Sequence, residues 1–509
     1  MNRLFLDRAE QNIPPLFSQT VTTEKTVEIV ADEKAFLGYS AHALGSMPEV
    51  VKAGDRFVLD FGRHCVGKVS FEVRDNGRYL DAPVRLKLKF GEVPYEIARD
   101  YATYHGDLCS SWLTEDIINV DRIGTVELPR RYSFRYIEVT VLATPRPTRL
   151  SDFSVVCETS ADTANWKSLP EGTDPELVEI DRVAAATLRD CMQSAYEDGP
   201  KRDRRLWSGD LYLQALTDQV LFDNAMLARR CLYLFAACEE EKEYLPGCLY
   251  QYPEVTFDKD MNISDYAMLY CVSLADYYFH TEDQKTAMEL FPVVKRQMQI
   301  SIDLMDKNGI IGMLENSWEG GFIDWAPNLK HNTAVQGVFL YALERLIPLA
   351  EALGESETAK AWREAQAKAM DGAKKYLYCE KCNAFINAYD GKQYSVQAQV
   401  WMILGGVIDG EKGKQMLKEA LVSPDSIKPV TPYMHHYLVA AMVKLGMMEE
   451  ALAHIKEYWG AMVKYGADTF WEVFVDHNPD VSPYNDPVMH SFCHAWSCSP
   501  SYFIRKYFV

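Results

Sequence analysis

The sequence has few of the features that mark membrane, secreted or nucleic-acid-binding proteins. No apolar run approaches the roughly 18 residues that a membrane-spanning helix needs. The apolar residues at the start are soon followed by Asp7, Arg8 and Glu10, so no signal peptide is recognised and we expect a cytoplasmic protein. Basic residues are also scarce. The chain has 53 Lys and Arg residues and 73 Asp and Glu residues, which gives a net charge of −20. This negative charge argues against binding to nucleic acid or to an anionic membrane.

Signals for cofactors are missing as well. Neither Gly-x-Gly-x-x-Gly nor Gly-x4-Gly-Lys-Ser/Thr, the glycine-rich loops that bind nucleotides, occurs in the chain. Of the 12 cysteines, Cys379 and Cys382 form a single Cys-x-x-Cys pair, and no second pair completes a four-ligand zinc site at a suitable spacing. Cys191, Cys231 and Cys271 lie on apolar stripes, which favours buried reduced thiols. We therefore predict no metal and no cofactor.

The first third of the chain has the alternation of β-structure. Residues 56–73 contain two alternating stretches, residues 84–90 alternate strictly, and residues 131–142 are rich in β-branched and aromatic side chains. Period-two patterns separated by turn residues are typical of antiparallel sheets. We predict an antiparallel β-sandwich domain over residues 1–162.

From Pro175 onward the apolar residues recur with the period of a helix. Further helical stripes cover residues 342–353, 358–377, 396–407, 412–421, 433–445 and 448–465. The remaining length allows about twelve helices with their connections. This mainly α domain, predicted over residues 163–509, fits an (α/α)6 barrel, although a solenoid or an irregular bundle would give the same periodicity.

Four connecting segments of the helical domain are rich in Trp, Asp, Glu and His: residues 196–210, 315–327, 466–476 and 487–500. Binding and catalytic residues concentrate on loops that a rigid scaffold carries. Aromatic residues, 12% of the chain, serve as platforms in sugar-binding clefts but also fill large cores. We expect the functional site at one end of the helical domain.

The first of these segments, YEDGPKRDRRLWSGD, ends with Asp210 and has two interpretations. In one it is a solvated ion-pair loop, with Ser208 capping the next helix. In the other it forms a polar pocket in which carboxylates and arginines bind paired hydroxyl groups and Trp207 stacks on a sugar ring. The residue types alone do not choose between them.

The same segment resembles the signature of bacterial α-L-rhamnosidases, glycoside hydrolase family 78, which runs Asp-Cys-Pro-x-Arg-Asp-Glu-Arg-Leu-Gly-Trp-x-Gly-Asp. The residues that match are Asp198, Pro200, Arg202, Asp203, Trp207, Gly209 and Asp210. FIDWAP, GADTFWE, HSFCHAW and LDFGRHCVGKV are similar to four further family motifs. The resemblance implies a β-sandwich followed by an (α/α)6 barrel. It also implies exo-acting, inverting release of terminal α-L-rhamnose or a related deoxyhexose.

The resemblance also implies roles for individual residues. Glu472, at the end of GADTFWE, is the expected catalytic base, and we expect the apolar wall of Trp471 to raise its pKa toward the working range. The substrate is expected to be a small carbohydrate or glycoside, with a homodimer as the candidate assembly. The expected sugar contacts are Asp198, Arg202, Trp207, Asp210, Trp318, Glu319, Asp324, Trp325 and His494.

The general acid departs from the family pattern. Where the family has Glu after the Arg-Asp pair, this chain has Arg204, and a guanidinium does not act as a proton donor. We predict that Asp203 takes over, with Glu197 or Glu319 as alternatives. The substitution also leaves two other functions open. One is a carbohydrate-binding protein that does not hydrolyse its ligand, and the other is a glycosidase or lyase with a different sugar specificity.

Overall fold

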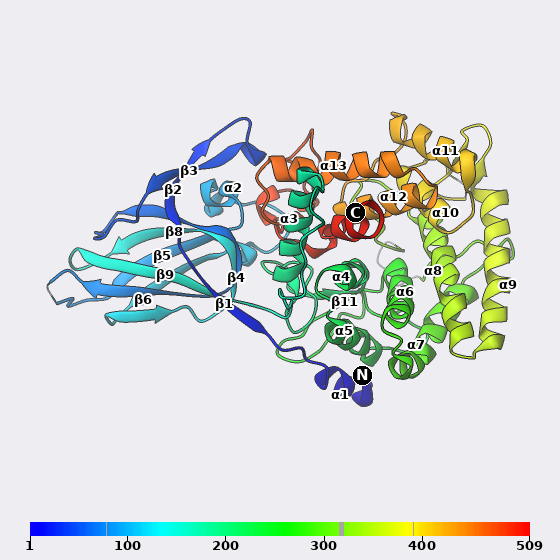
Figure 1. Ribbon diagram of the computed structural model, residues 1–509, viewed down its shortest axis with the longest axis horizontal. Coiled ribbons are helices and arrows are strands. Elements are labelled where there is room, and N and C mark those ends of the chain that lie inside the picture. The colour runs from blue at the N-terminus through cyan, green and yellow to red at the C-terminus, as the bar shows by residue number, and fades with distance from the viewer. Residues whose placement is uncertain (78, 315–319, 390) are drawn as a thin grey trace.

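The change from strands to helices occurs where the sequence pattern changes. The computed structural model describes residues 1–77, 79–314, 320–389 and 391–509. Strand β9 (Thr148–Thr159) is the last strand of the N-terminal domain, and helix α3 (Pro175–Cys191) follows after an irregular stretch. Figure 1 shows the strands at one end of the molecule and most helices at the other. The predicted order, a β-domain followed by a helical domain, is confirmed.

The N-terminal domain is an antiparallel sheet of nine strands in the described part of the chain. Its strands follow the order β1-β9-β4-β8-β5-β6, with β2, β3 and β7 paired at its sides. The bounds are β1 (Phe17–Thr22), β2 (Lys25–Ala31), β3 (Tyr39–Gly45), β4 (Arg56–Asp75), β5 (Val84–Gly91), β6 (Glu115–Val120), β7 (Gly124–Glu127) and β8 (Tyr132–Ala143). The short helix α2 (Pro94–Ala98) follows β5.

The 20-residue strand β4 organises this sheet. Residues 58–60 pair with β2, whereas residues 67–75 pair with β9, and the register against β8 shifts between Asp60 and Cys65. Such an irregularity bends a strand. Apolar residues from both halves share one core, in which Phe61 packs on Phe134 at a ring distance of 5.1 Å. The sandwich predicted from the alternation is therefore built from one continuous sheet.

The helical domain consists of the following elements. Its helices are α3 (Pro175–Cys191), α4 (Ser208–Leu221), α5 (Ala225–Ala237), α6 (Ser264–Thr281), α7 (Gln284–Asp303), α8 (Asn332–Ala352), α9 (Ser356–Gly372), α10 (Val396–Leu404), α11 (Gly410–Val422), α12 (Pro432–Lys444), α13 (Met448–Lys464) and α14 (Pro500–Phe503). Two small antiparallel sheets complete the domain. In one, β10 (Leu206–Trp207) pairs with β11 (Cys248–Leu249), and in the other, β12 (Tyr378–Cys379) pairs with β13 (Ala384–Phe385).

These helices form two concentric rings. Helices α4, α6, α8, α10 and α12 pack on one another in this order. Phe503 of α14 then packs on His436 of α12 at a ring distance of 4.9 Å, and α14 returns to pack on α4. Helices α3, α5, α7, α9, α11 and α13 pack on the outside of this inner ring. Burial follows the rings, because every residue of α10 is buried whereas α9 buries only four. The closed inner ring makes the domain an (α/α)6 barrel and excludes the open solenoid.

The first residues depart from the predicted domain division. Helix α1 (Arg3–Glu10) does not join the sheet but packs on α5, as Figure 1 shows near the N-terminus. The Asn2 amide donates to the Ala237 carbonyl at 2.7 Å, and Arg8 pairs with Glu289 at 2.9 Å. The chain therefore starts on the barrel and crosses to the β-domain. Among the helices of the described residues, none combines the length and apolar character that crossing a bilayer would require.

The close approach of α8 and α10 provides a test of the inner ring. A Cβ on Gly337 of α8 would lie 2.6 Å from the backbone carbonyl of Trp401 on α10. We expect Gly337→Ala to lower the stability by roughly 1–3 kcal/mol, because backbone atoms have to move apart. Thermal unfolding measures this, with Lys360→Ala on the exposed face of α9 as the control. A Gly337→Ala protein with an unchanged Tm would contradict the close packing.

Candidate active site

A cavity of about 240 Å³ lies where the barrel meets the β-domain. Loops that follow α3, β11, α7 and α13 contribute to its lining, together with the first turns of α4 and α6 and a segment of the β-domain. The lining residues are Leu108, Trp112, Asp198, Arg202, Asp203, Arg205, Trp207, Asp210, Met261, Ile263, Tyr266, Phe322, Trp325, Glu472, Tyr484, His494 and Trp496. Eight of the residues predicted from the sequence are thus brought together from distant parts of the chain.

The segment 198–205 turns back on itself around one carboxylate. Asp198 accepts the backbone N–H groups of Asp203 at 3.1 Å and of Arg205 at 3.0 Å. The turn directs Arg202 toward Glu472 and Tyr484, with its guanidinium 4.4 Å from the Tyr484 ring. The arginines of this loop are therefore not a solvated ion-pair cluster, because Arg202 is buried inside the site.

Glu472 is buried and has three donors around its carboxylate. The Arg202 guanidinium and the Tyr484 hydroxyl both donate to it, and the Ser491 amide donates at 2.9 Å. Burial opposes ionisation, but Arg202 outweighs it, with further contributions from His494 and His490, and lowers the pKa of Glu472 to about 2. Glu472 is therefore a carboxylate throughout the ordinary pH range.

This result reverses the expected direction of the Glu472 pKa. The sequence placed Trp471 beside Glu472 and suggested an apolar wall that raises its pKa. Trp471 instead points away from the cavity and stacks on Phe36 at a ring distance of 3.8 Å. Adjacent residues in an irregular segment face different directions, so Glu472 receives the field of Arg202 rather than the indole.

Asp198 and Asp203 have different surroundings although only a short turn separates them. Burial and the neighbouring charge of Asp203 raise the pKa of Asp198 to about 7. Asp203 is less buried, and its carboxylate lies 3.2 Å from Arg202 and 3.5 Å from Arg205. Asp198 therefore holds a proton up to about neutral pH.

Asp210 and His494 face each other across the cavity floor. Asp210 Oδ1 lies 3.3 Å from His494 Nε2. Burial raises the pKa of Asp210, and the contact with Asp210 raises the pKa of His494 against the opposing effect of burial. Among the described residues, His494 Nδ1 has no hydrogen-bond partner, and Asp210 Oδ1 and His494 Nε2 have only their contact with each other. Buried polar atoms are normally satisfied, so these atoms are suited to bind the hydroxyl groups of a ligand.

Several lining residues were not identified from the sequence. Tyr484 lies between the segments 466–476 and 487–500, and no sequence motif includes it. Trp112 comes from the β-domain, whose segment is tied to the barrel where the Asp107 amide donates to the Tyr484 carbonyl at 3.0 Å. Trp496 stands in the HSFCHAW motif but was not assigned a role. Only the folded arrangement reveals these three residues.

The structure places two other candidates outside the cavity lining, together with Arg204, the residue that stands in place of the family's acid. Asp324 accepts the Thr431 hydroxyl at 2.7 Å and the Gln397 amide at 2.8 Å, so its carboxylate fixes the loop before α12 rather than facing the cavity. Glu197, an alternative acid, is paired with Arg131 at 2.7 Å. Arg204 donates to the Pro200 carbonyl at 2.8 Å and does not line the cavity. Trp318 and Glu319 lie outside the described residues.

One group of potential metal ligands is found in the described part of the chain, and it does not include the Cys379 and Cys382 pair. The donor atoms of His64, Asp190 and Cys493 lie within 4.8 Å of one another. Both ring nitrogens of His64 are already engaged, one with Asp190 at 2.8 Å and the other with Ser133 at 3.0 Å. This buried group belongs to the contact between the domains, where its side chains already bind one another.

Comparisons with known proteins agree with this arrangement. The model for the glycosyl hydrolase family 78 alpha-rhamnosidase N-terminal domain matches residues 23–159. The model for the bacterial alpha-L-rhamnosidase 6 hairpin glycosidase domain matches residues 168–508. No curated protein matches the chain by sequence.

Solved structures give the same result. A rhamnosidase from Klebsiella oxytoca with rhamnose bound is 37% identical, with a TM-score of 0.95, and the match covers 100% of this chain and 99% of that one. The family 78 rhamnosidase of Bacillus sp. GL1 is 23% identical, with a TM-score of 0.77, and the match covers 92% of this chain and 49% of that one. The second similarity concerns the fold alone. The chain therefore belongs to glycosyl hydrolase family 78 and is a glycoside hydrolase of the α-L-rhamnosidase type.

Proposed function

We propose that the chain is an exo-acting, inverting glycosidase that removes terminal α-L-rhamnose, or a related deoxyhexose, from an oligosaccharide or glycoside. The observation that carries this proposal is that one cavity holds two carboxyl groups in opposite surroundings: Glu472 is paired with the Arg202 guanidinium, whereas Asp198 is buried beside Asp203. A pair of this kind provides an acid and a base at the same pH. The rhamnose bound to the Klebsiella oxytoca rhamnosidase supports the choice of sugar.

Glu472 is the proposed base. An inverting hydrolysis requires a carboxylate that removes a proton from water as the water attacks the anomeric carbon. Glu472 is ionised, and Arg202, Tyr484 and the Ser491 amide fix its orientation. The low pKa limits its strength as a base, so we infer that substrate binding weakens part of this hydrogen bonding before the water reacts.

The acid is the second half of the proposal. We assign the transferable proton to Asp198 because burial and the charge of Asp203 keep it protonated up to about pH 7. Asp203, which the sequence favoured, is paired with Arg202 and Arg205. Asp203 remains the alternative donor, because it is the less buried of the two and lines the same cavity.

The dimensions and walls of the cavity support exo action. Pockets that bind drug-sized ligands measure roughly 300–1,000 Å³, and this one is smaller, at about 240 Å³. Trp112 from the β-domain and Trp325 from the barrel both line it. A cavity of this size is suited to the terminal ring of a substrate. Asp210 and His494 offer polar atoms to its hydroxyl groups.

One observation favours a second candidate function. Arg204 stands where the family has its acidic residue, and its guanidinium is directed to backbone carbonyls outside the cavity. A chain without a working acid would bind the same sugar without cleaving a natural glycosidic bond. Turnover of a natural disaccharide therefore separates a hydrolase from a carbohydrate-binding protein.

Replacing the base tests the first assignment. We expect Glu472→Gln to lower kcat by roughly 10²–10⁴-fold, because the amide does not activate water, while rhamnose affinity falls far less. Steady-state kinetics and calorimetric titration with rhamnose measure the two quantities. Glu197→Gln is the matched control, since Glu197 is a buried carboxylate of the same region that does not line the cavity. Near-normal turnover by Glu472→Gln would refute the assignment.

Comparing two leaving groups tests the acid. We expect Asp198→Asn to lose roughly 10²–10⁴-fold in kcat/KM on a natural rhamnosyl disaccharide and far less on nitrophenyl α-L-rhamnoside, whose leaving group needs little protonation. Asp203→Asn serves as the comparison. If Asp203→Asn alone shows this difference between substrates, the proton donor is Asp203 instead.

The pH dependence gives an independent check. Activity on the disaccharide requires Asp198 to be protonated and Glu472 to be ionised. We therefore expect kcat/KM of the wild type to fall as the pH rises through about 7, the pKa of Asp198, and to persist into acid solution, because the pKa of Glu472 is about 2. A pH–rate profile with no decline between pH 6 and 9 would contradict Asp198 as the acid.

A further inference from the structure

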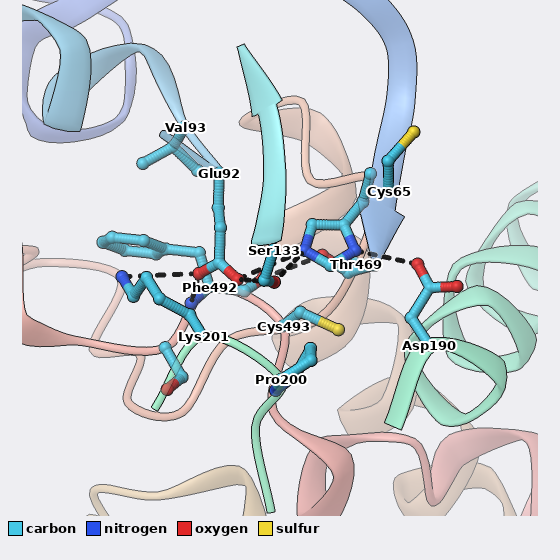
Figure 2. Close-up of polar contacts among 12 residues, drawn as sticks. Cys65, Glu92, Val93, Ser133, Asp190, Pro200, Lys201, Thr469, Phe492 and Cys493 are labelled. Atoms are coloured by element: carbon cyan, nitrogen blue, oxygen red, sulfur yellow. Dashed lines mark hydrogen bonds and ion pairs between the residues drawn. The ribbon is translucent and has the colours of Figure 1, made fainter. Parts of the chain in front are cut away.

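A buried polar cluster joins the β-domain to the barrel beside the active site. Figure 2 shows Glu92 and Ser133 from the β-domain facing Asp190, Lys201 and Phe492 from the barrel. Glu92 directly follows strand β5 and is 2% exposed. Burying so much charge at a domain contact is costly unless the groups are paired, and here they are connected in a continuous network.

Glu92 is the centre of this network. One of its oxygens accepts the Ser133 hydroxyl at 2.7 Å and lies 3.2 Å from His64 Nε2. The other accepts the Phe492 backbone amide at 2.7 Å and lies 3.4 Å from the Lys201 ammonium. A single carboxylate of the β-domain therefore contacts two separate segments of the barrel.

These two segments are the ones that hold Glu472. Lys201 precedes Arg202, whose guanidinium is paired with Glu472, and Phe492 follows Ser491, whose amide donates to Glu472 at 2.9 Å. The segments are also joined to each other. Arg202 Nε donates to the carbonyl of Met489 at 2.9 Å. Movement of either segment would therefore change the position of the Glu472 carboxylate.

The charges of the network support a fixed arrangement. Burial disfavours the charged form of Glu92, but Lys201 and His64 outweigh it and lower the pKa of Glu92 to about 2. The Lys201 ammonium also pairs with Glu96 of helix α2, at a distance of 2.7 Å. His64 continues the chain of contacts to Asp190 at 2.8 Å, and Asp190 is paired with Arg189 at 2.7 Å.

We propose that Glu92 is a positioning residue for hydrolysis: from the β-domain it fixes the segments around Lys201 and Phe492, and through them the carboxylate of Glu472. This inference rests on the proposed function, because it names the device that aligns the base of the same site. The β-domain is then part of the catalytic apparatus rather than an attached module. The barrel folded without this contact would have a complete set of site residues in a loosened arrangement.

Glu92→Gln tests the inference, because it keeps the shape of the side chain and removes its charge. Glu138→Gln is the matched control, since Glu138 is an equally buried glutamate of the β-domain that pairs with Arg56, and in the described part of the chain no hydrogen bond or ion pair joins its side chain to the barrel. We expect Glu92→Gln to lower kcat by roughly 10–100-fold with a smaller change in KM, as for a displaced catalytic group. Glu138→Gln should retain kcat within about twofold even if its Tm falls equally.

Two further readouts separate positioning from general stability. In Glu92→Gln the acidic limb of the pH–rate profile should move to higher pH, because Arg202 holds the Glu472 charge less well, and hydrogen exchange should increase in residues 489–494. Neither change is expected in Glu138→Gln. If Glu92→Gln does not accumulate as folded protein, Lys201→Gln removes the opposite end of the same contact and should give the same result.

The outcomes distinguish the two proposals. Equal kcat and equal exchange in Glu92→Gln and Glu138→Gln would overturn the positioning role, whatever the wild type hydrolyses. A wild type that binds rhamnose but does not turn over the disaccharide would overturn the proposed function. In that case the exchange of residues 489–494 in the two variants still decides whether Glu92 positions the loop.

Discussion

The buried ion pair between Arg202 and Glu472 is the interaction on which the rest of the site depends. It joins the segment after α3 to the segment after α13, and it keeps Glu472 ionised in surroundings that exclude most water. Removing one partner of such a pair costs about 3–5 kcal/mol, because the other charge is left unpaired. Arg202 also contacts Met489, Asp203 and the ring of Tyr484, so one guanidinium sets the positions of several lining residues.

The need to hold Arg202 and Glu472 in place explains why buried charged groups join the two domains. Glu92 and Glu96 of the β-domain hold Lys201, the neighbour of Arg202, and Glu92 also holds the Phe492 amide. The barrel supplies most residues of the cavity that we propose binds the sugar, and in the same proposal the β-domain limits how far their loops can move. The two pKa values then shift in opposite directions. Burial, together with the neighbouring Asp203 carboxylate, raises the pKa of Asp198, whereas the Arg202 guanidinium outweighs burial and lowers the pKa of Glu472.

The sequence was informative wherever a residue's environment follows from periodicity or from a motif. The stripe over residues 396–407 corresponds to α10, and that over residues 448–465 corresponds to α13. Motifs also identified Asp198, Glu472 and His494 as members of one site. The direction in which each side chain points and the shift of its pKa were not predictable, because both depend on contacts between segments that are distant in the sequence. Asp324 therefore points to Thr431 instead of the cavity, and Glu472 has a lowered rather than a raised pKa.

The stereochemistry of the first product tests the central claim most directly. If Glu472 activates water while a separate carboxyl group protonates the leaving oxygen, a single displacement inverts the anomeric carbon. Proton NMR during early hydrolysis of an α-L-rhamnosyl disaccharide should then show β-L-rhamnose first, with the α-anomer increasing only as the sugar mutarotates. Initial release of α-L-rhamnose would mean that a covalent glycosyl intermediate forms, and would contradict the roles assigned to Glu472 and Asp198.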